Sequence, residues 1–467
     1  MASTQSPVAE SLRQALFANR PLMPAKDRAA LVTLYARWSW NDMAQLTAGA
    51  VQELSALRGQ RVAVVHRGDG PTWAALAALD ELRADVFLLN PMLSRAAQRQ
   101  LADEFSLAAI VSTANAVNGE RQVHEIQPFE NAAAGSGQST VTILTSGTSG
   151  RPKAVRHHWG SLCRPVRLTA AQQPPVWLQT YLPNLYAGVQ VSLQCLLNGG
   201  MLVCPDPAAD VDQIIEMMLQ ERVAFASATP SYWRRLLLFG NAQKLRSVPL
   251  KQITLGGEVV DQQVLDLLKA TFPQARIAHI YATSELGRCF SVTDGQAGFP
   301  ARWIGSVTTD GVELKIEEDE LLARSPNVML GYDRLSVPSD INAGSAPANA
   351  WIATGDLVRR IGDRCVFVGR SSDMINVGGN KVYPQEVEPV LRAVPGVADV
   401  RVYAAQSSLV GQLVAAQVVA ARAEEADAVK DRVIETAART LAPHQRPRLI
   451  DMVARIELSD AGKMVRR

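Results

Sequence analysis

The residues best suited to chemistry lie in one short loop between two apolar runs. The sequence reads VTILTSGTSGRPKAV from residue 141 to 155, and the loop itself offers Thr145, Ser146, Gly147, Thr148, Ser149, Gly150 and Lys153. Glycines let backbone N–H groups approach a ligand closely, hydroxyls add donors, and the lysine adds a positive charge. This combination predicts a polyphosphate site rather than a flexible linker. The spacing of its glycines and lysine differs from that of a Walker loop.

Five further segments carry polar or glycine residues beside apolar runs. In chain order they are LGGEVV (255–260), YATSE (281–285), TGDL (354–357), GRSSDMINVGGNKVYPQEVE (369–388) and LSDAGKMVRR (458–467). Together with the loop, these segments resemble the signature motifs of the acyl-adenylate-forming superfamily. That superfamily includes acyl- and aryl-CoA synthetases, the adenylation domains of peptide synthetases and the luciferases. The motifs stand in the family's order, so the resemblance covers essentially the whole chain.

The resemblance implies a nucleotide site for ATP and Mg²⁺. The loop would hold the β- and γ-phosphates, and Gly256 and Gly257 would let a flat ligand lie against the backbone. The segment YATSE has alanine where the family pattern has glycine. Within this segment, Tyr281 would pack against adenine, Ser284 would contact the α-phosphate and Glu285 would bind the metal. Later in the chain, Asp356 would bind the ribose, and Arg370 would contact ribose or phosphate.

The resemblance also implies a catalytic lysine on a mobile C-terminal domain. Lys463 would bridge the carboxylate and the α-phosphate during adenylate formation. The domain would then rotate about a hinge and bring the Gly378–Gly379 loop to the acyl-adenylate for the thiol step. The family usually has aspartate or lysine at the hinge, whereas this chain has Ser372.

The acid pocket is expected to follow the phosphate loop. Its predicted residues are Tyr186, Gly188, Thr229, Glu258 and Thr283. No charged residue lies between residues 168 and 205, so a buried α-ammonium group would have no carboxylate partner there. An apolar or aromatic acid is therefore predicted, and an α-amino acid is not. The alternative for Tyr186 is ordinary core packing.

The thiol is predicted to be coenzyme A, because the segment GGNKVYPQEVE resembles that of bacterial acid–CoA ligases. The alternative is a stand-alone acyl-AMP ligase that loads the phosphopantetheine of an acyl or aryl carrier protein. A third hypothesis is a non-catalytic ligand-binding homologue, since one fold can serve several functions. The retained Lys153, Glu285, Asp356, Arg370 and Lys463 argue against that third hypothesis.

The composition excludes several other classes of protein. The chain has 467 residues, a formal net charge of +2 and no basic stripe for nucleic acid. The uncharged segment 168–205 is interrupted by glutamine, asparagine, proline and glycine, which favours buried core over a membrane span. Five scattered cysteines and the lack of an apolar leader at the N-terminus predict reduced thiols and a cytoplasmic location.

The order of predicted elements indicates an α/β fold. Strands at 61–67, 86–90 and 108–112 alternate with helices, the first of which is predicted to be capped by Asn41 or Asp42. We expect a large N-terminal domain of parallel-rich sheets with flanking helices and a β-rich subdomain (1–369). A hinge (370–373) and a small, mobile α+β domain (374–467) would follow.

Overall fold

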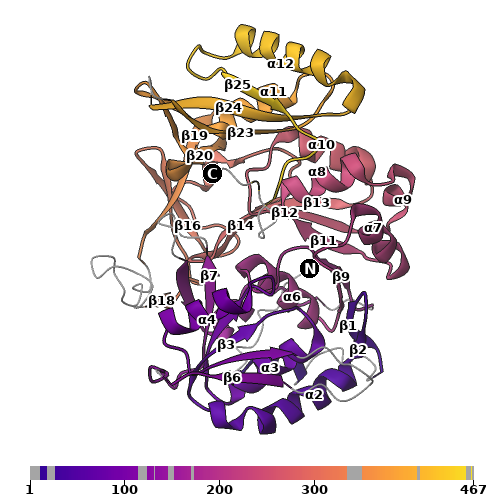
Figure 1. The fold of residues 1–467 in the computed structure, drawn as a ribbon, viewed down its shortest axis with the longest axis vertical. Helices are drawn as coiled ribbons and strands as arrows, with labels where there is room; N and C mark the ends of the chain where they lie inside the picture. Colours follow the sequence, from indigo (N-terminus) through magenta and orange to yellow (C-terminus); the bar gives the residue numbers. More distant parts are fainter. Residues whose placement is uncertain are drawn as a thin grey trace.

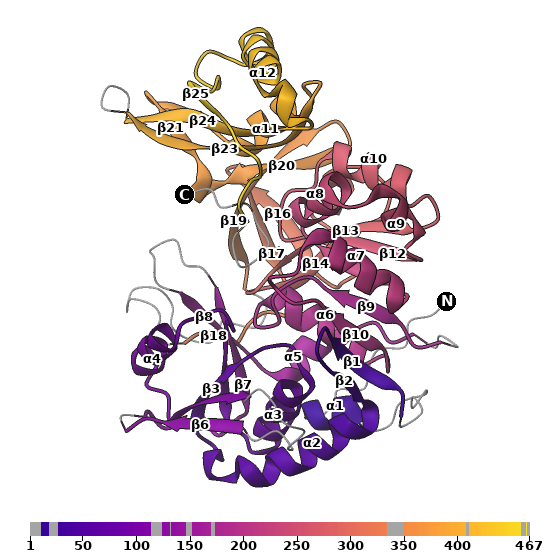
Figure 2. The same cartoon turned by 45° about the vertical axis from the view of Figure 1, so that its right-hand side comes forward.

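The computed structural model describes residues 11–17, 27–113, 124–130, 132–145, 152–169, 173–333, 350–407, 411–458 and 464. These residues form two sheets with helices between and outside them, a small antiparallel sheet, and a C-terminal unit (Figure 1). Turning the molecule shows the C-terminal unit lying over α8 and α10 at one end (Figure 2). The predicted α/β class is confirmed.

The first sheet has the strand order β18-β8-β7-β4-β3-β5-β6. Its strands are β3 (Arg61–Val65), β4 (Asp85–Leu89), β5 (Ala109–Thr113), β6 (His124–Pro128), β7 (Thr140–Thr145), β8 (Lys153–His157) and β18 (Gly331–Tyr332). The strands β3, β4, β5 and β7 run parallel, whereas β6, β8 and β18 are antiparallel to their neighbours. Because β7 and β8 pair antiparallel, the phosphate loop is the connection between two adjacent strands.

The second sheet has the order β14-β13-β12-β11-β9-β10-β1-β2. Its strands are β1 (Ala29–Thr33), β2 (Arg37–Ser39), β9 (Val176–Gln179), β10 (Met201–Cys204), β11 (Phe225–Ala228), β12 (Gln252–Gly256), β13 (Arg276–Thr283) and β14 (Gly287–Val292). The strands from β13 to β1 are parallel, and the edges β14 and β2 are antiparallel.

Helices separate the two sheets and cover their outer faces. The helical segments of these layers are α1 (Leu12–Phe17), α2 (Trp40–Glu53), η1 (Ser55–Leu57), α3 (Gly70–Glu81), α4 (Arg95–Glu104), α5 (Trp159–Cys163), α6 (Tyr186–Leu196), α7 (Val211–Gln220), α8 (Pro230–Phe239), α9 (Ala242–Ser247) and α10 (Gln262–Thr271). Alternate residues of β3 face opposite cores, with Val62 and Val64 toward the middle helices and Ala63 and Val65 toward α4. This period of two is expected for strands buried on both faces.

The first long helix begins at Trp40, two or three residues earlier than a cap at Asn41 or Asp42 implies. Its N-cap is Ser39, whose side chain accepts from the backbone of Asp42, while Asp42 bonds back to the Ser39 backbone. The predicted caps Asn41 and Asp42 were therefore wrong, because Asp42 is the third helical residue of a capping box.

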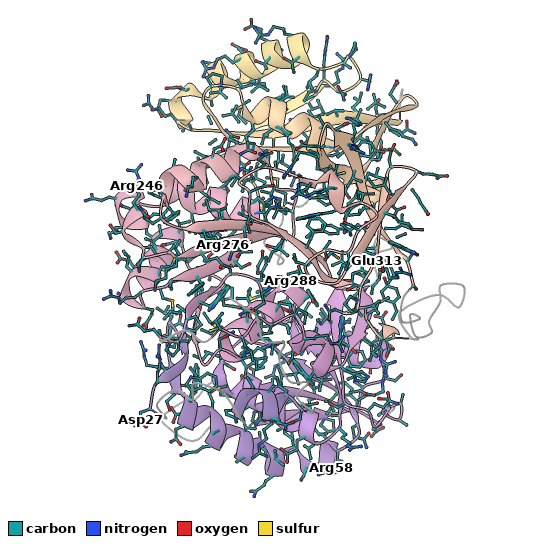
Figure 3. The ribbon with its side chains drawn as sticks, turned by 180° about the vertical axis from the view of Figure 1, so that it is seen from behind. Asp27, Arg58, Arg246, Arg276, Arg288 and Glu313 are labelled. Carbon is teal, nitrogen blue, oxygen red and sulfur yellow. The ribbon has the colours of Figure 1, made fainter. Side chains whose placement is uncertain are left out.

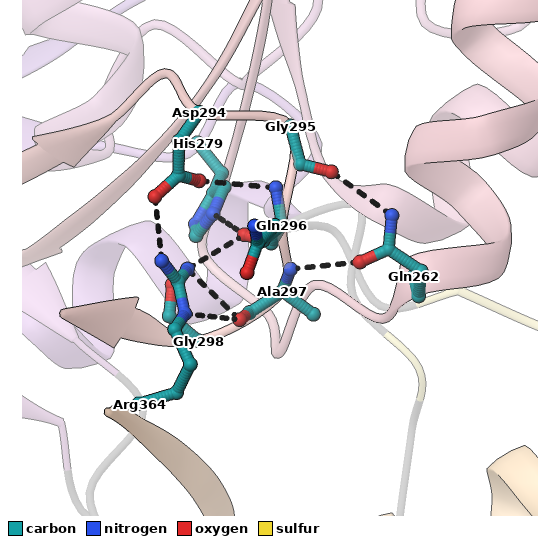
Figure 4. A network of polar contacts seen from close by, with 8 residues as sticks. All are labelled: Gln262, His279, Asp294, Gly295, Gln296, Ala297, Gly298 and Arg364. Carbon is teal, nitrogen blue, oxygen red and sulfur yellow. Dashed lines mark hydrogen bonds and ion pairs between the residues drawn. The ribbon is translucent and has the colours of Figure 1, made fainter. Parts of the chain in front are cut away.

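A small antiparallel sheet follows the second sheet. It has the order β15-β20-β19-β17-β16 and contains β15 (Phe299–Pro300), η2 (Ala301–Trp303) beside it, β16 (Glu313–Glu317), β17 (Glu320–Arg324), β19 (Ile352–Ile361) and β20 (Arg364–Arg370). Arg364 on β20 ties this sheet to the turn after β14, since it donates to the carbonyls of Gln296, Ala297 and Gly298 and pairs with Asp294 (Figure 4).

The C-terminal unit is a sheet with two helices on it, in which all strand pairs are antiparallel except β24 and β25. Its elements are β21 (Ile375–Val377), β22 (Asn380–Val382), α11 (Pro384–Arg392), β23 (Val397–Ser407), β24 (Gly411–Ala420), η4 (Ala423–Glu425), α12 (Ala426–Thr440) and β25 (Leu449–Met452). Its buried residues, from Ile375 to Leu441, form a core of their own. A short 3₁₀ turn, η3 (Ser371–Asp373), precedes the unit. The proposed domain limits at 369 and 373 stay a prediction.

Candidate functional site

A cavity of about 790 Å³ lies between the second sheet and α6. It is large enough for a drug-sized ligand. The predicted residues that line it are Thr145, Lys153, Tyr186, Gly256, Gly257, Thr283, Ser284, Glu285 and Arg370. They come from both sheets, from α6 and from the end of β20, so the fold brings distant motifs to one space.

One end of the cavity carries a group of three side chains suited to phosphates. Lys153, the first residue of β8, places its Nζ 5.7 Å from the ring centre of Tyr332. The Tyr332 hydroxyl donates to Glu285 Oε1 at 3.1 Å. Burial, with the neighbouring Glu285, raises the pKa of Tyr332, so its hydroxyl stays protonated and can donate. The lysine is held beside the carboxylate without an ion pair to it among the described residues.

The backbone next to Glu285 is fixed by a buried histidine. His157 Nε2 lies 2.8 Å from the carbonyl oxygen of Ser284, and its ring centre is 5.9 Å from that of Tyr186. Burial lowers the pKa of His157 to about 4, so it is neutral near pH 7 and donates from Nε2. This histidine therefore links the wall of the acid region to the residue predicted to meet the α-phosphate.

Asp356 is the centre of a polar network rather than a free carboxylate. Tyr281 Oη donates to its Oδ2 at 2.6 Å, and Arg370 Nε donates to its Oδ1 at 2.8 Å. Each carboxylate oxygen can accept more than one hydrogen bond, so acceptor capacity remains for a ligand. The Tyr281 ring stacks with Phe290 and Phe367, at centroid distances of 5.2 and 5.0 Å. The adenine-packing and ribose-binding roles stay predictions.

The glycines at the end of β12 are held in place by a tyrosine. Tyr181 lines the cavity and donates from its hydroxyl to the carbonyl of Gly256 at 3.1 Å. A Cβ atom on Gly256 would lie 3.3 Å from the carbonyl oxygen of Ile280, and Gly257 has a φ of +83°. The close approach and the left-handed backbone both favour glycine here.

Three predicted pocket residues do not line the cavity. A Cβ on Gly188 would lie 2.0 Å from the Leu182 carbonyl oxygen, so this glycine allows α6 to pack closely. Thr229 is the buried N-cap of α8. Glu258 accepts from the backbone N–H of Ser231 at 3.0 Å.

The C-terminal motif reaches the same region. Met464 donates its backbone N–H to Glu258 Oε1 at 2.8 Å. Lys463 itself and the loop residues Ser146, Gly147, Thr148, Ser149 and Gly150 lie outside the described residues.

The predicted thiol-step loop is a tight hairpin turn in the C-terminal unit. Gly378 and Gly379 connect β21 and β22 with φ angles of +56° and +91°. Two successive residues with positive φ define a turn for which glycine is strongly preferred. These glycines do not line the cavity in this arrangement of the chain.

The motifs, the cavity and the fold agree with one family. The family model described as AMP-binding enzyme matches residues 23–333, which is more than half of the chain. The chain belongs to the AMP-binding enzyme family. The model described as AMP-binding enzyme C-terminal domain matches residues 386–463. The resemblance to the acyl-adenylate-forming superfamily is thereby confirmed.

Curated relatives are similar over most of their length. The chain is 26% identical over 436 residues to 2-succinylbenzoate–CoA ligase of Bacillus cereus, covering 88% of each chain. It is 27% identical over 368 residues to the medium/long-chain-fatty-acid–[acyl-carrier-protein] ligase FadD10 of Mycobacterium tuberculosis, covering 72% of this chain and 67% of the relative.

Solved structures share the whole fold at low sequence identity. The anthranilate CoA ligase AuaEII in complex with anthranoyl-AMP has a TM-score of 0.78 and 17% identity, covering 98% of this chain and 96% of that one. The o-succinylbenzoate CoA synthetase (MenE) of Bacillus subtilis has a TM-score of 0.72 and 19% identity, covering 99% and 98%. These likenesses establish the fold of the chain.

Three residues of the site were not found from the sequence. Tyr181 lies five residues before the predicted pocket residue Tyr186, Tyr332 lies in a short strand far from Glu285 in the chain, and His157 is the last residue of β8. Only Tyr181 had a signal in the sequence, namely its position close to Tyr186.

Proposed function

We propose that the chain activates an apolar or aromatic carboxylic acid as an acyl-adenylate and transfers the acyl group to coenzyme A. The class of enzyme is an AMP-forming acid–thiol ligase, in line with the family and with curated relatives named CoA ligases. The observation that supports the proposal most is that one continuous cavity is lined both by Lys153, Ser284 and Glu285 and by an apolar region beside α6.

In the first step, a carboxylate oxygen of the acid attacks the α-phosphorus of ATP. The bond from that phosphorus to the β-phosphate bridging oxygen breaks, and pyrophosphate leaves with the electron pair. Charge remains on phosphate oxygens throughout, so positioning and electrostatic stabilisation provide the catalysis. Lys153 and the phosphate loop would hold the β- and γ-phosphates, and Lys463 would bridge the carboxylate and the α-phosphate.

The residues at this end of the cavity suit Mg²⁺. Within the described ranges, no three His, Cys, Asp or Glu side chains gather as a metal site. Mg²⁺ nevertheless needs only one or two protein carboxylates when substrate phosphates and water complete its shell. Glu285 supplies a carboxylate, with the hydroxyls of Thr283 and Ser284 next to it on the cavity wall. When bound, Mg²⁺ would neutralise phosphate charge.

In the second step, a thiolate attacks the carbonyl carbon of the adenylate, and AMP leaves as the carbon–oxygen bond breaks. No protein nucleophile is required. The described cysteines are all buried and unbridged. Burial raises the pKa of Cys163 to about 12, which keeps that thiol protonated near neutral pH. The Gly378–Gly379 hairpin would approach the adenylate after rotation of the C-terminal unit.

A carrier-protein thiol is the second candidate acceptor. The similarity to a relative named as an acyl-carrier-protein ligase favours it.

Among the described residues, no helix is both long and apolar enough to cross a bilayer.

The test is acid-dependent ATP–pyrophosphate exchange over fatty, aryl and amino acids, repeated with coenzyme A and analysis of AMP and thioester. We expect pyrophosphate exchange with one class of acid, and thioester formation only when coenzyme A is present. Exchange without a coenzyme A product would favour the carrier protein. No exchange in folded protein that binds ATP would contradict the proposal and favour a non-catalytic homologue.

Asp356→Asn is expected to raise the KM for ATP about tenfold, the effect of one lost charge-assisted hydrogen bond. The substitution keeps the shape of the side chain but removes its charge, which also loosens Arg370. The KM for ATP is measured in the exchange assay at saturating acid. Tyr281→Phe is the control, since it removes a protein hydrogen bond to Asp356 but no ligand contact of the carboxylate. An unchanged KM in Asp356→Asn would remove this residue from the ribose site.

Tyr186→Ala is expected to change the preference among acids, because the side chain lies on the cavity wall at the start of α6. The ratios of kcat/KM over the acid panel should shift by about tenfold, the effect of deleting a buried aromatic wall. Uniform loss with unchanged ratios would show that Tyr186 only packs the core.

A further inference from the structure

The floor of the cavity is one face of the second sheet. Along β13 the cavity is lined by every second residue, namely Arg276, Ala278, Ile280 and Ala282. On β12 the cavity is lined by Gln252, Thr254 and Gly256, and near the end of the strand also by Leu255. Ile253, between Gln252 and Thr254, packs into the core beneath α7, α8 and α10. The cavity therefore runs along the strands as a channel, from their carboxyl ends to their amino ends.

The register of the strands divides this floor into rows. Ser227, Thr254 and Ala278 are partners across the sheet and form a middle row of small side chains. Trp177, Phe225, Gln252 and Arg276 are likewise partners and form the outer row. Because a strand rises about 3.3 Å per residue, the outer row lies about 13 Å from Ile280. Small residues leave the channel open as far as the outer row.

The outer row combines a flat apolar surface with a cation. The rings of Trp177 and Phe225 stack with centroids 5.1 Å apart. Arg276, the first residue of β13, is exposed and follows them in the row. Figure 3 shows Arg276 and Arg288 on the strands of the second sheet.

Three of the arginines that line the cavity, Arg167, Arg276 and Arg288, differ in their partners. Arg288 lies opposite Ala282, at the other end of β13 from Arg276. Arg167 pairs with Asp310 at 3.2 Å, and Arg288 pairs with the same carboxylate at 2.7 Å. Arg276 has no side-chain partner among the residues that the structure describes. Its guanidinium is the one of these three that keeps its full hydrogen-bonding capacity for a ligand.

We propose that the acid substrate is elongated and carries a second anionic group, such as a distal carboxylate, which Arg276 binds at the outer row. This inference rests on the proposed adenylation, because it requires the reacting carboxylate to lie at the Ser284–Glu285 end. An aromatic or unsaturated segment of the acid lies against Trp177 and Phe225. A guanidinium presents paired donors that match a carboxylate.

The test compares matched acids that differ only in the distal group. The pairs are dodecanoate with dodecanedioate, and 4-biphenylcarboxylate with 4,4′-biphenyldicarboxylate. We expect at least one diacid to exceed its monoacid by about tenfold in kcat/KM for exchange, the effect of one charge-assisted hydrogen bond. Arg276→Gln should abolish this preference, Arg276→Lys should keep part of it, and Arg246→Gln on the remote helix α9 should leave it unchanged.

The assays distinguish a missing distal site from a missing adenylation activity. Exchange with monoacids, no preference for any diacid, and no effect of Arg276→Gln would overturn the distal site while adenylation stands. If no acid supports exchange, calorimetry of the same acids with the unmodified protein and with Arg276→Gln tests the distal site directly. Diacid binding that Arg276→Gln weakens would still support the site, and equal binding by both proteins would overturn it.

Discussion

Replacing Lys463 with alanine is expected to reduce adenylate formation by about 10²–10³-fold, the usual cost of removing one preorganised donor from a developing negative charge. The reason is the place of this lysine in the C-terminal motif. The next residue, Met464, is hydrogen-bonded to Glu258, which immediately follows the Gly256–Gly257 pair at the cavity. The measurement is acid-dependent ATP–pyrophosphate exchange by the variant at saturating substrates.

The same variant should still form thioester from a supplied acyl-adenylate at close to the normal rate. We propose that the lysine serves the first step alone and that the Gly378–Gly379 hairpin of the same unit serves the second. Lys430→Ala, on α12 of the same unit, is the matched control and should leave both steps unchanged. Equal losses in the two half-reactions would refute the assigned role and point to a general effect on the C-terminal unit.

Much of the fold could be predicted from local patterns. Apolar runs at β3, β4 and β5 alternate with helices, and Pro71 stands in the first turn of α3. These features depend on neighbouring residues, which explains why the parallel arrangement was predicted correctly. The misplaced cap of α2 shows the limit of such reasoning, since Ser39, Asn41 and Asp42 are all good capping residues and only the strand before the helix decides between them.

The site was predictable only where a motif marked it. Glu285 and Lys153 were predicted from their motifs, but the side chain that contacts both belongs to Tyr332, 47 residues from Glu285 in the chain. No local pattern distinguishes that tyrosine from any other. The channel beyond Tyr186 was missed for a similar reason. It depends on the register of four parallel strands, and register is a property of the assembled sheet.

An ion network between the two parts of the chain leads to the second large prediction. Arg392 on α11 donates from Nη1 to Asp261 Oδ2 at 3.0 Å. Asp261 also pairs with Arg234 on α8, and it is the N-cap of α10. The side chains of Arg392 and Arg234 are only 4% and 5% exposed. The carboxylate of Asp261 therefore connects α8 and α10 of the second-sheet layer to α11 of the C-terminal unit.

The charge of Asp261 is stabilised by these neighbours. Burial alone would raise the pKa of Asp261, but the guanidiniums of Arg234 and Arg392 outweigh that effect and lower it below the ordinary value. A lowered pKa in the folded state contributes stability that is present above the unfolded pKa and is lost as the pH falls through the folded pKa. The network should therefore hold at neutral pH and weaken only in acid.

Asp261→Asn is expected to destabilise the protein by about 3–5 kcal/mol, the usual cost of leaving a buried charge without its partner. The charge in question is that of Arg234, since Arg392 still pairs with Asp399. Asparagine still caps a helix, so the substitution removes the charge and leaves the start of α10 intact. Thermal unfolding and limited proteolysis between residues 370 and 374 measure the effect. Asp266→Asn, on the exposed side of the same helix, is the control.

The same substitution should affect the two half-reactions unequally. Both the Arg392–Asp261 pair and the Met464–Glu258 hydrogen bond join the C-terminal part of the chain to the segment 258–261. Loss of the ion network should therefore weaken this position of the C-terminal unit, which we propose is the one used for adenylation. Exchange should fall more than thioester formation from supplied adenylate, as in Lys463→Ala but to a smaller extent. If stability and both rates match those of Asp266→Asn, the buried pairs do not hold the two parts together. A fall in stability with equal loss of both rates would mean that the network supports the fold but does not favour either arrangement of the C-terminal unit.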